Sequence, residues 1–313
     1  MITIDNYIPV LQTIENRADA YSNEYASPYE KEFAEKCFQR ERQSLSALPL
    51  SDDELRESAK LCKKWLDEFD EYNKSIGSSL QNLAEQPQDV VGREKELDLL
   101  EQVLTRPITP IALLIGNAGV GKTAIVEEFV KRTNEGRLGI RGVKYLVVSL
   151  ALGALSALDR NKLQAAISNV LADLKNFEIK AQKALMDDEV KMLLFIDEVH
   201  MLVTIFGEGT KIGGDLAKDK LARAPIRVIA ATTSREYDST IAVDEPFAER
   251  FKRIEIQELD RTVVHDIARN WWSKVAVGCP AIGDDVIEYI IDNNKTYRPS
   301  EAEPRKTLDT LED

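Results

Sequence analysis

Hydrophobic residues between positions 86 and 257 fall into short runs that alternate with amphipathic helical stretches. These apolar runs occupy 110–115, 143–149, 191–196, 226–231 and 253–256. Continuous apolar runs of this length, separated by helices, are typical of parallel strands that are buried on both faces of a sheet. The pattern therefore predicts an α/β core at 86–257, built on a five-stranded parallel sheet.

The pattern becomes purely helical after Gln257. Amphipathic stretches run from Thr262 to Val277 and from Asp284 to Asn293. They predict a small α-helical lid at 258–313. The chain stops at Asp313 within this region, and we expect the native sequence to continue beyond it.

Residues 1–85 have a third pattern, which predicts a separate all-α region. Ser51 and Glu54 have the spacing of a capping box, and the helix after them carries a heptad seam of Leu55, Ala59, Cys62, Leu66, Phe69, Asn73, Ile76, Leu80 and Leu83. Tyr29–Leu48 offers a partner face, so an intramolecular hairpin is favoured and an intermolecular coiled coil stays open. Docking of an adaptor, a substrate or a partner subunit is the role that we expect for this region.

Composition limits the function classes. The chain has 313 residues with 43% hydrophobic and 30% charged side chains, and 41 basic against 54 acidic residues give a net charge of −13. Such a charge disfavours nucleic acid and anionic membranes as partners. The three cysteines lack metal-binding spacing, and no apolar run approaches the roughly 18 residues of a membrane span. We expect a soluble, cytoplasmic protein.

Residues 116–123 read Gly-Asn-Ala-Gly-Val-Gly-Lys-Thr, between the apolar run that ends at Ile115 and a helical stretch from Ala124. This is a phosphate-binding loop in its expected context of strand and helix. Its backbone N–H groups surround a polyphosphate, the Lys122 ammonium reaches the β- and γ-phosphates, and the Thr123 hydroxyl ligates Mg²⁺. The predicted nucleotide-binding residues are Gly116, Asn117, Ala118, Gly119, Val120, Gly121, Lys122, Thr123 and Ala124.

A second motif follows the apolar run Met192–Ile196, which ends in Asp197 and Glu198. In phosphate-loop ATPases an acid at the end of such a strand holds Mg²⁺, and the next acid polarises the attacking water. Asp197 is therefore the predicted metal residue beside Thr123, and Glu198 is the predicted catalytic base.

With these motifs in place, residues 88–313 resemble the first ATPase ring of the Clp-type AAA+ protein unfoldases and disaggregases. The similarity is carried by four segments, Val90–Glu94, Gly119–Glu127, Phe195–His200 and Ala230–Tyr237. It implies the AAA+ fold of a phosphate-loop NTPase, ATP as the nucleotide, and assembly into a ring, a hexamer in this family. It also implies that Val91 and Gly92 pack on adenine and that Thr232 contacts the γ-phosphate and orients water.

Two further site residues come from the same resemblance. Ala248–Phe251 is similar to the segment that carries the arginine finger, which implies that Arg250 acts on the nucleotide of a neighbouring subunit. The family usually shows two adjacent arginines there, and this chain has Glu249 before Arg250. Pro304–Asp309 resembles the lid helix whose basic residue senses nucleotide, which implies Lys306, with the adjacent Arg305 as the alternative.

One segment departs from the family. Clp unfoldases place an aromatic residue in the loop after the second strand to grip a threaded polypeptide, and Ala151–Arg160 contains none. An aliphatic loop offers less contact area to a substrate. The sequence shows no nucleophilic partner for His200 or His265, and both are interpreted as structural.

The function predicted from these features is ATP hydrolysis by a Clp-group ring that remodels protein substrates. A first alternative is an ATP-gated assembly module with slow hydrolysis and no threading. A second is a DNA-handling AAA+ regulator, which the acidic charge and the lack of a helix-turn-helix pattern disfavour.

Overall fold

The structure is a computed structural model, and it describes residues 13–15, 17–18, 51–78, 80–81, 90–107, 110–138, 143–152, 160–202, 226–243, 245–276 and 280–312. Its regular elements are, in chain order, α3 (Asp52–Ser75), β1 (Leu80–Gln81), α4 (Glu94–Leu104), β2 (Ile111–Ile115), α5 (Lys122–Asn134), β3 (Lys144–Leu150), α7 (Arg160–Leu185), β4 (Val190–Ile196), β5 (Arg227–Thr232), α10 (Ser234–Glu236), the π-helix η2 (Tyr237–Ile241), α11 (Glu245–Ala248), β6 (Lys252–Glu255), α12 (Arg261–Val275), α13 (Asp284–Tyr297) and α14 (Arg305–Glu312).

The described strands form a mostly parallel sheet in the order β1-β3-β4-β5-β2-β6. The five apolar runs became β2 to β6 with ends within one residue of the prediction, and all five residues of β2 are buried. Pairing is parallel between β3 and β4 and between β2 and β6. The α/β fold is confirmed. The expected count of five strands is wrong, because β1 adds an antiparallel strand beside β3.

The strand β1 exists because α3 ends earlier than its heptad pattern predicts. Ser51 and Glu54 form the predicted capping box at the start of α3, but the helix ends at Ser75 rather than continuing past Leu83. Gly77 takes the left-handed backbone, with φ of 72°, that reverses the chain at little steric cost. The Asn73 amide then donates to the Leu80 carbonyl at 2.8 Å and accepts from its N–H at 2.9 Å. These bonds hold the chain in the extended form that pairs with β3.

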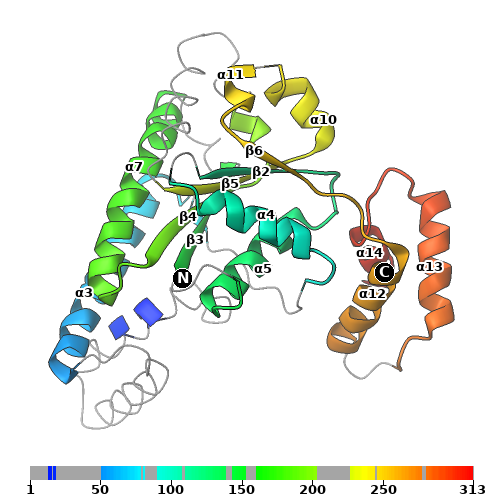
Figure 1. Cartoon of the computed structure of the whole chain (residues 1–313), viewed down its shortest axis with the longest axis horizontal. Helices are drawn as coiled ribbons and strands as arrows, with labels where there is room; N and C mark the ends of the chain where they lie inside the picture. Colours follow the sequence, from blue (N-terminus) through cyan, green and yellow to red (C-terminus); the bar gives the residue numbers. More distant parts are fainter. Residues whose placement is uncertain are drawn as a thin grey trace. The chain divides into compact units, whose positions relative to one another are not determined.

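The first of two compact units comprises residues 1–85, 130–195 and 209–228. Among its described residues, α3 lies along α7 (Figure 1). The Trp65 indole is buried, stacks on Phe69 and donates to the Phe177 carbonyl at 2.9 Å. The described partner of the α3 seam is therefore α7, whereas the expected partner face Tyr29–Leu48 lies outside the described residues. The division of the chain after residues 85 and 257 stays a prediction.

The second unit comprises residues 86–129, 196–208 and 229–313. The predicted lid helices are present as α12 and α13, and α14 joins them around a small core of Val264, Ala268, Ile287, Ile291 and Leu311, with Trp271 and Trp272 packed against it. This unit also contains the phosphate loop and the ends of β4 and β5. No helix in the described part of the chain is long and apolar enough to cross a membrane.

Candidate nucleotide site

The phosphate loop connects the buried strand β2 to the first turn of α5. Gly119 and Gly121 have φ of 90° and 91°, a left-handed backbone that glycine adopts readily. Glycine is required at position 116 for a different reason, because an added Cβ would lie 2.5 Å from the Ile256 carbonyl oxygen. The backbone conformation favours glycine at positions 119 and 121, and the close carbonyl requires it at position 116.

The Lys122 ammonium lies over the loop that precedes it. Its Nζ donates to the carbonyl oxygens of Gly116 at 2.8 Å and Asn117 at 3.0 Å. Burial lowers the pKa of Lys122, and the nearby carboxylates, Asp197 foremost, oppose this effect. A lysine held by loop carbonyls at the N-terminus of a helix is placed to meet a polyphosphate.

The metal residues predicted from sequence lie close together. The Thr123 hydroxyl is 3.4 Å from Oδ2 of Asp197, although the two residues come from α5 and from the end of β4. Hydroxyl and carboxylate oxygens are ligands that Mg²⁺ accepts, and Mg²⁺ commonly keeps waters and phosphate oxygens in its remaining positions. The described residues include no group of three or more His, Cys, Asp or Glu side chains that could hold a metal without such help. The pair fits Mg²⁺ bound together with a nucleotide.

Glu198 differs from Asp197 in backbone and in exposure. It is exposed, and its φ of 53° is uncommon for a residue other than glycine. Its N–H donates to Oδ1 of Asp197 at 2.9 Å, and the next N–H, of Val199, donates to the Ala231 carbonyl of β5 at 3.0 Å. Such backbone strain concentrates at functional sites. The turn places the Asp197 carboxylate near the Thr123 hydroxyl and leaves the Glu198 carboxylate exposed to water.

Thr232 ends β5 and is buried, with 2% of its surface exposed. Its carbonyl accepts from the Gly116 N–H at 3.3 Å, so the end of β5 is fastened to the start of the phosphate loop. The Thr232 hydroxyl lies 3.2 Å from Nδ1 of His200, and the same Nδ1 is 3.4 Å from a carboxylate oxygen of Glu236. The sequence interpretation treated His200 as structural and did not consider Glu236.

The segment predicted to contact adenine lies against the start of the lid. Val91 is 41% exposed, and an added Cβ on Gly92 would lie 3.1 Å from Val263 of α12. The next side chain, Arg93, is buried and was missed from sequence. Its guanidinium donates to the carbonyl oxygens of Val120 at 2.8 Å and Gln257 at 2.9 Å. Arg93 thus connects the phosphate loop to the residue that precedes the lid.

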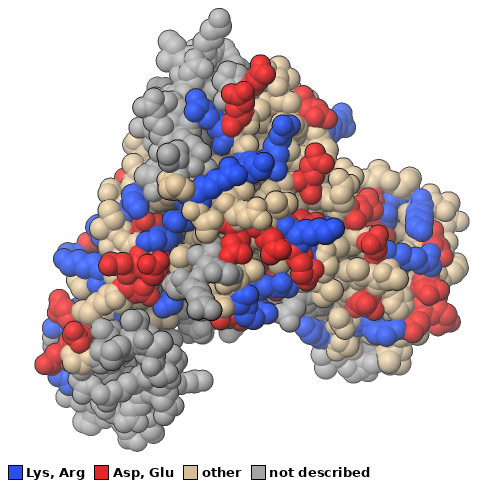
Figure 2. All heavy atoms as spheres, viewed as in Figure 1, with Lys and Arg blue, Asp and Glu red and all other residues tan. Residues whose placement is uncertain are grey.

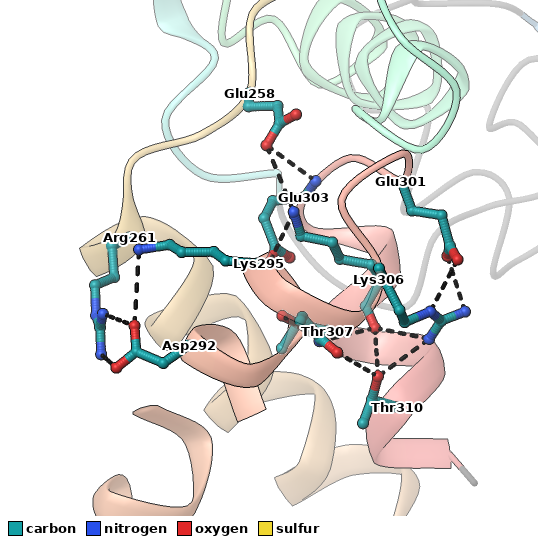
Figure 3. Close-up of polar contacts among 11 residues, drawn as sticks. Glu258, Arg261, Asp292, Lys295, Glu301, Glu303, Lys306, Thr307 and Thr310 are labelled. Carbon is teal, nitrogen blue, oxygen red and sulfur yellow. Dashed lines mark hydrogen bonds and ion pairs between the residues drawn. The ribbon is translucent and has the colours of Figure 1, made fainter. Parts of the chain in front are cut away.

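The two adjacent basic residues of α14 have different surroundings. Lys306 is buried, and Figure 3 shows it pointing toward Glu303 and Glu258, with Nζ–Oε distances of 3.6 and 4.0 Å. Arg305 instead borders the phosphate loop, since a Cβ added to Gly119 would lie 2.9 Å from the Arg305 Cβ. The geometry favours Arg305 over Lys306 as the lid cation nearest to a bound nucleotide.

The predicted residues of the phosphate loop, Asp197, Glu198 and Thr232 thus lie near one another at the ends of β2, β4 and β5, but Arg250 is separate from them. It follows α11 in an exposed turn, and its N–H donates to the Phe247 carbonyl at 3.1 Å. No hydrogen bond or ion pair joins its guanidinium to the part of the loop that the structure describes. An exposed position is the one that action on a neighbouring subunit requires.

A cavity of about 520 Å³ lies beside the phosphate loop. Its lining includes Asn117 of the loop, Tyr237 and Arg253, and the pre-lid residues Gln257 and Glu258. The volume is within the range of small-ligand sites. The lining does not include Lys122, Thr123 or Asp197, so the cavity adjoins the start of the loop rather than the predicted phosphate and metal residues.

Gly119→Ala tests the contact between loop and lid. We expect about a tenfold loss of nucleotide affinity, or about 1.4 kcal/mol, because the new Cβ meets Arg305 and the Ala302 carbonyl. Gly121→Ala is the matched control, since it lies in the same loop with a left-handed φ of 91°, and the nearest atom to its added Cβ is the Ala124 Cβ at 4.0 Å. Calorimetric titration with ADP measures both variants. Equal affinity losses in the two would show that backbone strain alone, not the loop–lid contact, is responsible.

Comparisons with known proteins agree with this geometry. The family described as AAA ATPase domain matches residues 89–235. The chaperone protein ClpB of Mycoplasma pneumoniae is 27% identical over 254 residues, which are 78% of this chain and 34% of that protein. ClpB of Rhodopirellula baltica is 34% identical over 228 residues, which are 68% of this chain and 24% of the relative.

A solved structure of the Saccharomyces cerevisiae Hsp104–ADP complex superposes with a TM-score of 0.59 and 31% identity, over 71% of this chain and 37% of the other. The chain therefore spans about a third of the length of relatives such as this Hsp104 and the M. pneumoniae ClpB. The family match over residues 89–235 includes the phosphate loop, the acidic pair after β4 and Thr232. The chain contains an AAA+ ATPase segment of the Clp type.

Proposed function

We propose that this chain binds and hydrolyses ATP with Mg²⁺, assembles into a ring, and remodels protein substrates. The observation that carries the proposal is the 3.4 Å approach of the Thr123 hydroxyl to the Asp197 carboxylate, directly after Lys122 and beside Glu198. A lysine, a hydroxyl and two carboxylates so arranged serve phosphoryl transfer to water. Adenine is favoured because the similar Hsp104 structure is an ADP complex.

Each side chain then has a role. The loop N–H groups and Lys122 hold the phosphates, and Arg305 approaches them from the lid. Thr123 and Asp197 would hold Mg²⁺, which would neutralise charge on the phosphate oxygens. Glu198 accepts the proton of the attacking water, and Thr232 orients that water against the γ-phosphate.

Substitution of Arg250 tests the proposed assembly into a ring. If Arg250 completes the site of a neighbouring subunit, the steady-state ATPase rate per subunit rises with protein concentration in the wild type. In Arg250→Ala we expect a low rate that no longer depends on concentration. Arg106→Ala, which removes another exposed arginine, is the control and keeps the wild-type behaviour. A concentration-independent rate unchanged by Arg250→Ala would contradict ring activation.

Remodelling of proteins is proposed from the ClpB and Hsp104 relatives, one of which was solved as an Hsp104–casein complex. We assign delivery of the substrate or adaptor to residues 1–85. Within that region α3 is fastened to α7 through Trp65 and Phe177, so α3 would serve as the fixed base of the docking region.

An ATP-gated assembly module is the second candidate, favoured by the absence of an aromatic residue from Ala151–Arg160 and by Glu249 before Arg250. A tagged, folded substrate separates the two functions. A remodelling ring unfolds it in the presence of ATP, whereas an assembly module forms oligomers with ATP and leaves it folded.

Surface charge supports a protein substrate over DNA. On the face shown in Figure 2, Lys and Arg side chains are interspersed with Asp and Glu rather than gathered in one broad basic area. Duplex DNA recognition draws on such an area. The cytoplasm is the proposed location, because the three cysteines are odd in number and far apart in the sequence, unlike a disulfide framework.

A further inference from the structure

The Thr232 hydroxyl lies beside His200, whose protonated nitrogen determines whether the hydroxyl donates or accepts a hydrogen bond. A hydroxyl both donates and accepts, and its hydrogen rotates to suit its neighbours. Here Oγ1 lies 3.2 Å from Nδ1 of His200. If Nδ1 carries a hydrogen, Oγ1 accepts it and the hydroxyl keeps its own hydrogen for another acceptor. If Nδ1 is bare, the hydroxyl donates to the histidine and has no hydrogen left for a phosphate.

Glu236 favours the state in which Nδ1 of His200 carries the hydrogen. Its Oε2 is 3.4 Å from the same Nδ1, and an ionised carboxylate can only accept. Burial raises the pKa of Glu236, but the hydrogen bonds from Thr233 and the charges of His200 and Lys122 outweigh it, so this pKa lies below its ordinary value. An ionised Glu236 beside Nδ1 favours the hydrogen on that nitrogen.

The carboxylate is fixed in place by its own surroundings. Its Oε2 accepts from the Thr233 hydroxyl at 2.6 Å and from the Thr233 N–H at 3.3 Å, while the Glu236 N–H donates back to that hydroxyl at 3.3 Å. This capping box directly follows Thr232 in the chain. His200 is anchored from the other side, since Val199 bonds the Ala231 carbonyl of the same strand. The three side chains therefore have fixed relative positions.

We propose that His200 and Glu236 are positioning residues that keep the Thr232 hydroxyl a hydrogen-bond donor toward the γ-phosphate position. The inference rests on the proposed ATPase function and adds two residues to it. Because ADP has no γ-phosphate, the pair contributes to the preference for ATP over ADP as well as to hydrolysis. Its action passes through Thr232, and neither residue needs to touch the nucleotide.

The test compares the binding of a slowly hydrolysed ATP analogue with that of ADP. In His200→Ala and Glu236→Gln we expect analogue affinity to fall about 2- to 10-fold, the value of one hydrogen bond, with ADP affinity unchanged. The ATPase kcat falls while KM for ATP changes less. His200→Asn, whose amide can donate from near the Nδ1 position, recovers part of both losses.

His265→Ala is the matched control, because both histidine side chains are 15% exposed and both lie within 4 Å of a carboxylate oxygen. We expect its preference for the analogue over ADP to equal that of the wild type. Unchanged ADP binding in the His200 and Glu236 variants shows at the same time that they are folded.

The outcomes separate the two levels of inference. A wild type that hydrolyses ATP, combined with variants in which both nucleotides weaken together or neither does, overturns the role of His200 and Glu236 alone. A wild type that binds neither nucleotide overturns the proposed function, and this assignment with it.

Discussion

Replacing Glu198 with glutamine is expected to lower the ATP hydrolysis rate by about 10²- to 10⁴-fold, the usual contribution of a general base, while ATP still binds. The amide has the size of the carboxylate but cannot take a proton from water. Glu198 is exposed, and its left-handed φ of 53° is set by the turn, so the backbone strain is the same with glutamine. Hydrolysis should therefore fall without a matching loss of stability.

The measurement is a steady-state ATPase assay combined with calorimetric binding of ATP to the same preparations. Glu245→Gln, another exposed glutamate in the same compact unit, is the control and should keep the wild-type rate. A Glu198→Gln rate within threefold of the wild type would remove Glu198 as the base. Loss of ATP binding together with hydrolysis would instead assign Glu198 to the binding of the nucleotide.

The strands and the phosphate loop could be predicted from the sequence because the physics that fixes them is local. The five apolar runs match the strands β2 to β6 to within one residue, and β2 is buried along its whole length. The loop motif carries its own requirements, since the left-handed backbone at Gly119 and Gly121 needs glycine. Asp197 could be predicted for the same reason, because it is the first residue after a buried strand.

What the sequence could not predict depends on contacts between distant residues. The end of α3 depends on the Asn73 amide meeting Leu80, and β1 depends on a pairing with β3. His200 meets Thr232 from 32 positions away. A partial signal was present, because Thr233 and Glu236 have capping-box spacing.

The sequence could not decide between Lys306 and Arg305, for a geometric reason. Neighbouring residues on a helix point about 100° apart, so a motif alignment that is uncertain by one position changes the direction of the side chain. In the structure Lys306 turns into the lid toward Glu303 and Glu258, and Arg305 borders the loop at Gly119. Only packing distinguishes the two.

Which side chains α3 buries also depends on packing against α7, which the sequence pattern does not show. The heptad seam omitted Trp65, which is 2% exposed and has a larger side chain than any residue in that seam. Its ring centroid lies 4.9 Å from that of Phe69 and 5.9 Å from that of Phe177 on α7. Trp65 lies three residues after Cys62 and four before Phe69, and residues three and four apart share one side of a helix.

Trp65→Ala is therefore expected to lower the free energy of unfolding of the first compact unit by about 3–5 kcal/mol, the range for a large aromatic side chain truncated in a core. The change removes two ring contacts, opens a cavity between α3 and α7, and leaves the Phe177 carbonyl without the indole donor. Urea unfolding followed by circular dichroism measures the loss.

Two further variants make the result specific. Trp65→Phe keeps a ring and loses the indole N–H, so we expect a smaller cost of about 1–2 kcal/mol. Lys64→Ala changes the neighbouring residue, whose side chain is 73% exposed, and should stay within about 0.5 kcal/mol of the wild type. If Trp65→Ala cost less than about 1 kcal/mol, α3 would unfold independently of α7, which is the behaviour of a separate N-terminal region. A loss in the full range would instead make α3 a structural part of the first compact unit, together with α7.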